Sequence, residues 1–185
     1  MQSLKNIVLL SLASFVTIDA KCDMPKNMAY FDITKFDTAA VAHNWYIHEV
    51  GTSDPTITSI TPTCFRWTFS PITVASGSFG VGAYKRNGGS GTTTPMTFKY
   101  KAGLWTDNNA VDYHVLATDY ANYAIIYSCD ELATIPATVR VMTNSATAPT
   151  ATQLASWTAV AAKKVQSFNM DWLLTVDHSA CSGYV

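Results

Sequence analysis

Short β-rich segments are the feature that most constrains how this chain can fold. They recur from Trp45 to Thr143, and most of the gaps between them are short enough for hairpins. Turn-forming clusters such as NGGSGTTTP and TDNNA separate them. The segments are WYIHEVG, TCFRWTFSPITVA, SFGVGAYKR, MTFKYKAGLW, DYHVLATDY, YAIIYSC and ATVRVMT. Many strands at close spacing predict an antiparallel sandwich or an up-and-down barrel.

One helix is expected after the strands, in the segment TATQLASWTAVAAKKV. Thr150 and Gln153 have the spacing of a capping box, which satisfies backbone N–H groups at a helix start. The apolar residues of the segment recur at helical spacing and form one stripe. This stripe is Leu154, Trp157, Ala161 and Val165. We therefore expect an amphipathic helix that lies against the strands, followed by a last strand in FNMDWLLTVD.

The composition limits the class of protein. Apolar residues make up 48% of the 185 residues and charged residues only 14%, so the chain can bury a core and is not expected to be disordered. The net charge of −1 argues against nucleic acid as a partner, because proteins that bind nucleic acids carry basic stripes. We predict a single domain without a nucleic-acid partner.

Residues 1–20 have the pattern of a signal peptide. Lys5 precedes an apolar run from Ile7 to Ile18, and Ile18 and Ala20 suit positions −3 and −1 of a cleavage site. The run is short for a membrane span, and the alternative is a buried N-terminal helix. We predict cleavage after Ala20, no membrane span, and a secreted, extracellular domain of residues 21–185.

Four cysteines are widely spaced, with no CxxC pair of the kind that zinc sites favour. They are Cys22, Cys64, Cys129 and Cys181. In an oxidising compartment an even number of cysteines predicts two disulfides. Four cysteines allow three connectivities, and their spacing does not choose between them.

Three motifs occur in an order that resembles the lipocalins. DTAAVAHNWYIHEV resembles their first motif, a short helix followed by Gly-x-Trp-Tyr, with Trp45 and Tyr46 matching and His43 in place of the glycine. ATDYANYAIIYSC resembles the second motif, and TVRVMT offers Arg140 for the arginine of the third. With the late helix, the chain looks like a lipocalin of the calycin superfamily, over nearly the whole mature sequence.

Among lipocalins the chain is most similar to insect types, such as triabin and nitrophorin salivary proteins. These begin the mature chain with Lys-Cys, as Lys21 and Cys22 do here. The resemblance implies an eight-stranded antiparallel up-and-down barrel with one C-terminal helix packed outside. It also implies that Arg140 stacks on Trp45 to close the barrel's base through a cation–π contact. The disulfides that it implies are Cys22–Cys129 and Cys64–Cys181.

These implied disulfides predict which side chains face the barrel interior. If Cys64 and Cys129 point outward, alternation turns the bulky apolar residues of their strands inward. On MTFKYK the two lysines should face water, which turns the alternate residues inward. The predicted inward set is Phe65, Trp67, Phe69, Met96, Phe98, Tyr100, Tyr113, Val115, Ala117 and Ile126, and all of these except Ala117 are predicted to bind the ligand, together with Glu49. Tyr100, Tyr113 and Ser128 would orient a ligand. Two alternatives remain open: the aromatic residues fill the barrel, or a β-bulge reverses a strand's parity.

Glu49 shares the predicted inward parity of Trp45 and Ile47. A carboxylate on a pocket wall is costly unless it is paired, so Glu49 would meet a cationic ligand such as an amine, or an internal Arg or Lys. The alternative is a strand end in water, which Gly51 just after it supports.

Catalytic and metal-binding patterns are lacking in the sequence. His43, His48, His114 and His178 are scattered, with no pair at metal-ligand spacing. Haem-carrying relatives use a histidine in the region from GVGAYKRN to MTFKYK, where this sequence has none, so haem is not expected. No GxSxG nucleophile motif occurs, and we predict that the protein is not an enzyme.

The resemblance implies a secreted protein that holds one small, mainly hydrophobic ligand, as a carrier or scavenger. Candidate ligands are a lipid, an eicosanoid, a bilin or an amine. The alternative is a triabin-like inhibitor of a host protease, which would bind its protein partner through the loops NGGSGTTTP and TDNNA. These loops lack the Trp, Tyr and Arg anchors of interface hot spots. The sequence leaves the ligand's identity and charge open.

Overall fold

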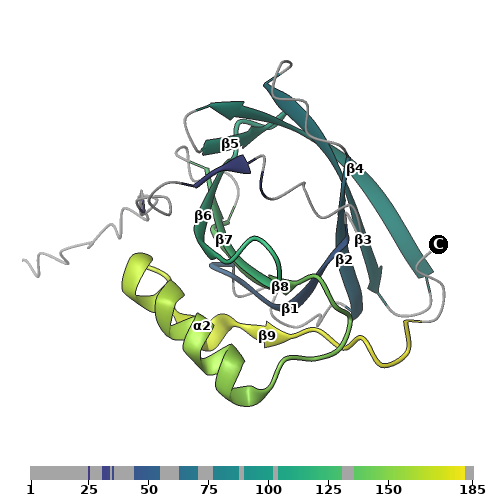
Figure 1. Cartoon of the computed structure of the whole chain (residues 1–185), viewed down its shortest axis with the longest axis vertical. Helices are drawn as coiled ribbons and strands as arrows, with labels where there is room; N and C mark the ends of the chain where they lie inside the picture. The colour runs from purple at the N-terminus through teal and green to yellow at the C-terminus, as the bar shows by residue number, and fades with distance from the viewer. Residues whose placement is uncertain are drawn as a thin grey trace, which may run out of the picture.

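Eight strands close into an antiparallel up-and-down barrel in the computed structural model (Figure 1). The structure describes residues 25, 31–33, 35, 44–54, 63–70, 77–87, 90–101, 104–130 and 136–181. Each strand pairs with the next along the chain, and β1 pairs with both β8 and β2, which closes the sheet. The predicted architecture is confirmed. None of the helices in these ranges is long and apolar enough to cross a membrane.

The barrel strands are short and follow one another with few intervening residues. They are β1 (Asn44–Thr52), β2 (Thr63–Phe69), β3 (Ser78–Asn87), β4 (Ser90–Lys101), β5 (Leu104–Asp107), β6 (Asp112–Thr118), β7 (Tyr123–Cys129) and β8 (Thr138–Thr143). β-Branched and aromatic residues dominate them, as expected for a half-buried pleated surface.

The helix α2 (Ala151–Lys164) follows the barrel and lies against its outer face (Figure 1). Its capping box is present: the Gln153 backbone N–H donates to Thr150 Oγ1, and the Thr150 N–H donates to Gln153 Oε1 at 2.9 Å. Trp157 stacks on Tyr123 with ring centroids 4.8 Å apart. The helix and the turn after it bury an apolar layer of outward-facing strand residues. This outer cluster includes Leu116, Ile125, Tyr127, Val139, Val141, Ala161, Val165 and Phe168.

The last predicted strand is much shorter than expected. Part of FNMDWLLTVD forms the 3₁₀ helix η3 (Met170–Trp172), and only β9 (Leu174–Thr175) is extended. β9 adds to the outside of the barrel by pairing with β1. The Asn169 side chain caps η3 by accepting from the Asp171 N–H at 3.0 Å, which favours a helical turn here over a strand.

The disulfide Cys64–Cys181 is present and ties the start of β2 to the C-terminal segment. Its Cα atoms are 5.4 Å apart, within the range of an ordinary disulfide. Cys22 lies outside the described residues, so its pairing with Cys129 stays a prediction. Residues 1–20 also lie outside them, and cleavage after Ala20 is likewise untested.

The segment NGGSGTTTP is not a long loop. β3 and β4 stay paired as far as Asn87 and Ser90, so only residues 88 and 89 separate the two strands. Thr92, Thr93 and Thr94 are β-branched and keep the strand extended although they are exposed. Most of this segment, one of the two recognition loops that the inhibitor interpretation named, is therefore paired strand.

Candidate functional site

The two ends of the barrel differ. We call the end with the β6–β7 hairpin the base and the end with the β5–β6 turn the mouth. At the base, Phe31 stacks on Tyr120 at 5.8 Å and contacts the Trp105 ring at 5.9 Å. The Asp32 N–H donates to the Tyr120 hydroxyl at 2.9 Å, and Ile33 belongs to the inner core. Residues 31–33 thus cover the base.

Aromatic side chains fill the lower half of the barrel, next to the base. Phe79 stacks on Phe98 at 5.2 Å and meets Trp105 edge-on at the same distance. Trp45 and Phe69 complete this aromatic plug, and no member is more than 4% exposed. In this lower half, the aromatic side chains fill the barrel, as the alternative to an open cavity predicted. The inward positions of Phe79 and Trp105 were not predicted, because their strands had no cysteine or charge alternation to fix the parity.

The predicted inward set faces the interior with one exception. Most of its members belong to the buried inner cluster or pack against it. These are Phe65, Trp67, Phe69, Met96, Phe98, Tyr100, Tyr113, Val115 and Ile126. Ala117 instead packs with the outer cluster, because a register shift between Val115 and Ala117 reverses the parity of β6. That these residues bind a ligand stays a prediction.

Arg140 lies inside the barrel and not over Trp45 at its base. On β8 it pairs with Ile126, an inward residue of β7. Its guanidinium carbon lies 5.1 Å from the Trp67 ring centroid and 5.7 Å from that of Tyr113. The predicted stacking on Trp45 is therefore wrong: the alternation of β8 turns Arg140 toward the inner aromatics of β2 and β6.

Polar groups around Arg140 form a small network in the upper half, near the mouth. Arg140 Nη1 donates to Ser128 Oγ at 2.9 Å. The Tyr113 hydroxyl donates to Asp107 Oδ2 at 3.3 Å, and the other oxygen of Asp107 accepts the backbone N–H of Val111 at 3.0 Å. The mouth therefore has hydrogen-bonding groups above an apolar floor.

The Arg140 guanidinium is surrounded by protein without an anionic partner. Among the described residues no carboxylate pairs with it, and its Nε has no hydrogen-bond partner. Burial lowers the pKa of Arg140, while Tyr113 and Asp107 act to raise it. Burial also raises the pKa of Tyr113. Arginine keeps its proton in proteins, so Arg140 brings a positive charge into this network, in which Asp107 is the nearest described carboxylate.

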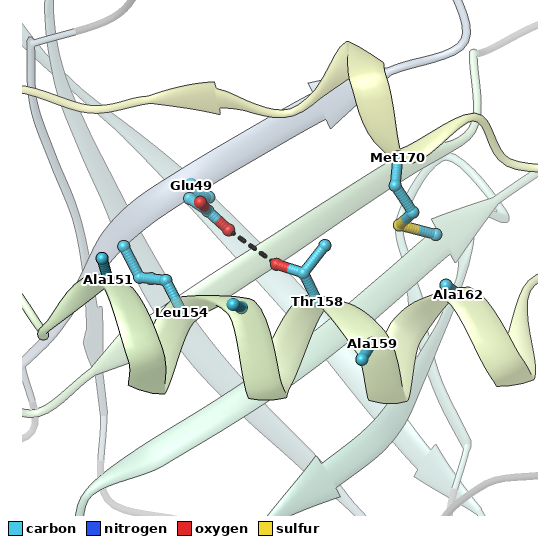
Figure 2. A pocket seen from close by; sticks show the side chains of 8 residues that line it. Glu49, Ala151, Leu154, Thr158, Ala159, Ala162 and Met170 are labelled. Carbon is cyan, nitrogen blue, oxygen red and sulfur yellow. Dashed lines mark hydrogen bonds between the residues drawn. The ribbon is translucent and has the colours of Figure 1, made fainter.

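Glu49 points out of the barrel. The register of β1 against β8 shifts between Ile47 and Glu49, so the intervening His48 forms a bulge. The Thr158 hydroxyl of α2 donates to Glu49 Oε2 at 3.1 Å (Figure 2). Both predicted environments, an interior wall and a strand end in water, are wrong. Half-burial raises the pKa of the Glu49 carboxyl, and the Thr158 bond acts to lower it.

A groove of about 560 Å³ lies at Glu49, between α2 and η3 (Figure 2). Small side chains on α2 leave this space open. The residues that line it are Glu49, Ala151, Leu154, Ala155, Thr158, Ala159, Ala162 and Met170. It is separate from the barrel interior, because Glu49 faces away from it.

Two histidines that are far apart in the sequence meet on the outside of the barrel. The rings of His48 and His178 lie 4.9 Å apart. His48 Nε2 lies 2.9 Å from the Ser145 carbonyl, and His178 Nε2 lies 2.9 Å from the Ile47 carbonyl. Since a carbonyl can only accept, each Nε2 carries a proton. Burial lowers the pKa of His48 to about 4 and also lowers that of His178.

Sequence spacing does not show this pair, because the bulge and the docked C-terminal segment bring the rings together. Asp177 is next to His178 in the chain and acts to raise its pKa. Within the described ranges no three His, Cys, Asp or Glu side chains gather as a metal site would require. His48, His114 and His178 do not face the interior: His114 pairs with the outward Tyr127.

Three solved structures resemble the whole barrel. The siderocalin Ex-FABP has a TM-score of 0.63 at 17% identity, over 76% of this chain and 96% of its own. The major allergen Per a 4 from cockroaches has a TM-score of 0.65 at 18% identity, over 88% and 98%. Apocrustacyanin C1 has a TM-score of 0.60 at 16% identity, over 83% of both chains. Identities this low show a shared fold alone.

The family comparison is more specific than the structural likeness. The search of curated proteins found no match. The model of the lipocalin / cytosolic fatty-acid binding protein family matches residues 42–153, which run from the start of β1 into α2 and cover more than half of the chain. The chain therefore belongs to the lipocalin / cytosolic fatty-acid binding protein family.

Proposed function

We propose that this protein is a secreted lipocalin that binds one small, mainly hydrophobic ligand in the upper half of its barrel. The observation that supports this most is the contrast between the two halves. The aromatic plug fills the base, whereas the inward-facing Phe65, Ala83 and Arg140 toward the mouth keep part of their surface accessible. A ligand entering by the mouth would rest on the plug and cover this wall.

Burial of apolar surface would supply most of the affinity, at about 25 cal/mol per Å². The few polar groups near the mouth, Tyr113 and Ser128 among them, would orient the ligand. Two of the similar structures are described as siderocalins with dual ligand specificities or a dual ligand-binding mode, which supports binding as the common task of this fold. Carrier and scavenger require the same site.

The test is direct binding with a variant that blocks the site. Purified protein is titrated with fatty acids, eicosanoids, bilins and amines, followed by tryptophan fluorescence and native mass spectrometry. Ala83→Trp places a large ring beside Trp67, its partner on β2, and we expect it to weaken binding at least tenfold. Thr97→Trp adds the same ring on the exposed outer face of β4 and serves as the control.

Failure of all four ligand classes to bind the wild-type protein more tightly than about millimolar would overturn the proposal. Equal effects of the two Trp variants would place binding outside the barrel. Secretion has its own test: expression in secretory cells and N-terminal sequencing of the product, which we expect to begin at Lys21.

A role without catalysis completes the proposal. The polar groups near the mouth are an arginine, a serine and a tyrosine, and the one carboxylate of this network, Asp107, is held by the β5–β6 turn. Ser128 Oγ accepts from Arg140, and the described histidines lie on the outside, so no base faces this hydroxyl. We expect purified protein to release its ligand chemically unchanged, as mass spectrometry of the bound and recovered ligand would show.

A further inference from the structure

We infer that the ligand bound in the barrel carries an anionic group, such as a carboxylate, sulfonate or phosphate, that pairs with Arg140. This rests on the proposed function, because it concerns the same site and adds the charge of the ligand. The lipocalin resemblance implies that Arg140 lies at the barrel's base as a structural residue. The structure places it inside, near the mouth, where a ligand would lie.

The first argument is the uncompensated charge. A buried charge without a partner is costly, and proteins normally pair it or bind an ion there. The Arg140 guanidinium has one described hydrogen bond, to the neutral Ser128 hydroxyl, and its Nε is unsatisfied. A ligand anion would supply the missing opposite charge and accept from the unused N–H groups.

The second argument is that the guanidinium is held in place before any ligand arrives. It lies over the rings of Trp67 and Tyr113, and Ser128 fixes one of its nitrogens. A planar guanidinium in a fixed orientation can bind a carboxylate or sulfonate through two parallel hydrogen bonds. Side-chain ordering, which weakens many binding events, is thus largely complete in the empty protein.

The third argument is that the nearest acid does not fill this role. Asp107 is hydrogen-bonded to the Tyr113 hydroxyl, and its charge acts on Arg140 without a direct hydrogen bond to the guanidinium. Its Oδ1 accepts the backbone N–H groups of Asn109 and Val111 and so holds the β5–β6 turn. Glu49, which could have neutralised Arg140 from β1, faces the opposite side of the sheet. Among the described residues, no carboxylate therefore pairs directly with the Arg140 guanidinium.

Two fluorescent probes of the same shape test the inference. 1-Anilinonaphthalene-8-sulfonate and N-phenyl-1-naphthylamine share one aromatic skeleton and differ by the sulfonate. We expect the protein, as it is isolated from the expressing cells, to bind the sulfonate probe at least tenfold more tightly than the neutral probe. A hydrogen bond between charged groups contributes that much free energy. Competition by dodecanoate and by dodecanol extends the comparison to aliphatic ligands, with dodecanoate expected to displace more strongly.

Variants then assign the preference to Arg140. Arg140→Met keeps the apolar contact but removes the charge, so it should weaken binding of the sulfonate probe at least tenfold more than binding of the neutral probe. Arg140→Lys should retain most of the preference. Lys99→Met is the matched control, because it removes one cation from the exposed outer face of β4 and should change neither probe.

The outcomes separate this inference from the proposal beneath it. If both probes and both alkyl competitors bind wild-type protein equally well, the barrel binds ligands without regard to charge and the inference is wrong. If none of them binds, the inference is wrong, while the proposed function is decided separately by the titration with the four ligand classes. A preference that survives in a folded Arg140→Met protein, or one that Lys99→Met removes, would assign the anion to another cation. Because the wild-type comparison needs no variant, poor folding of Arg140→Met leaves the test intact.

Discussion

Acidification should weaken the contact between the rings of His48 and His178 on the outside of the barrel. In the folded protein His48 is 2% exposed, and its Nε2 proton is held by the Ser145 carbonyl. Adding a proton at Nδ1 would create a buried cation 4.9 Å from a second histidine ring. Because the His48 carbonyl also accepts the Val176 N–H at 2.8 Å, a cation at His48 would weaken the docking of the C-terminal segment, which the Cys64–Cys181 disulfide still holds to β2.

The magnitude follows from the pKa of His48, which falls from 6.5 to about 4 on folding. Each pKa unit corresponds to about 1.4 kcal/mol. Keeping the His48 ring neutral in the folded protein therefore contributes at most about 3 kcal/mol to the free energy of unfolding. Since the folded pKa is the lower one, this contribution is fully present above pH 6.5. It is lost as the pH falls from 6.5 toward 4, where only the unfolded chain binds the proton.

The assay is urea unfolding between pH 7.5 and pH 4, for the wild-type protein and for His48→Gln. Glutamine can still donate from its amide nitrogen to the Ser145 carbonyl but does not titrate. Other acidic and basic groups, including Asp177 and His178, remain in both proteins, so the difference between the two curves isolates His48. We expect that difference to change by about 2–3 kcal/mol across this range. An NMR titration of the His48 ring gives its pKa directly.

Parallel stability curves for the two proteins would refute this reasoning. So would an NMR pKa for His48 near 6.5, which would mean that the ring is hydrated in solution. His178→Gln serves as a second control. Its removal takes away the neighbouring ring that lowers the pKa of His48, so the His48 titration should move to higher pH.

Three further predictions concern stability. Cys64→Ser together with Cys181→Ser removes a disulfide whose cysteines are 117 positions apart in the sequence. In the chain-entropy model this lowers the free energy of unfolding, measured in urea, by up to about 5 kcal/mol, and a loss under about 1 kcal/mol would contradict that model. Thr150→Ala removes the cap of α2 and should cost about 1 kcal/mol, whereas Thr152→Ala in the first turn should cost much less in the same thermal melts. Arg140→Met removes a buried charge that lacks an anion, so the urea midpoint of the ligand-free protein should rise; a fall would show that its contacts with Trp67 and Tyr113 outweigh the burial of its charge.

Local patterns of the chain determine the barrel and the helix. In a strand such as Tyr123–Cys129 the period of two puts Ala124, Ile126 and Ser128 on one face, and the outward Cys129 implied by the lipocalin resemblance made that face the inner one, as the structure has it. The capping box at Thr150 and Gln153 likewise needs only neighbouring residues. These features follow from the sequence because the interactions that cause them join residues a few positions apart.

Features that depend on register could not be predicted in this way. The bulge at His48 is set by how β1 pairs with β8, and it moves Glu49 from the inner face to the groove under α2. The shift before Ala117 has the same origin on β6.

The side chain that Arg140 meets was also decided by the tertiary structure. Its strand is periodic, but only closure of the barrel brings Trp67, Tyr113 and Ser128 around the guanidinium. The His48 and His178 rings meet because the C-terminal segment docks along β1. One extra residue in a strand reverses every side chain beyond it, and no local pattern records that residue. The sequence by itself thus determines which strands exist, whereas the paired neighbours decide which charges lie inside the barrel.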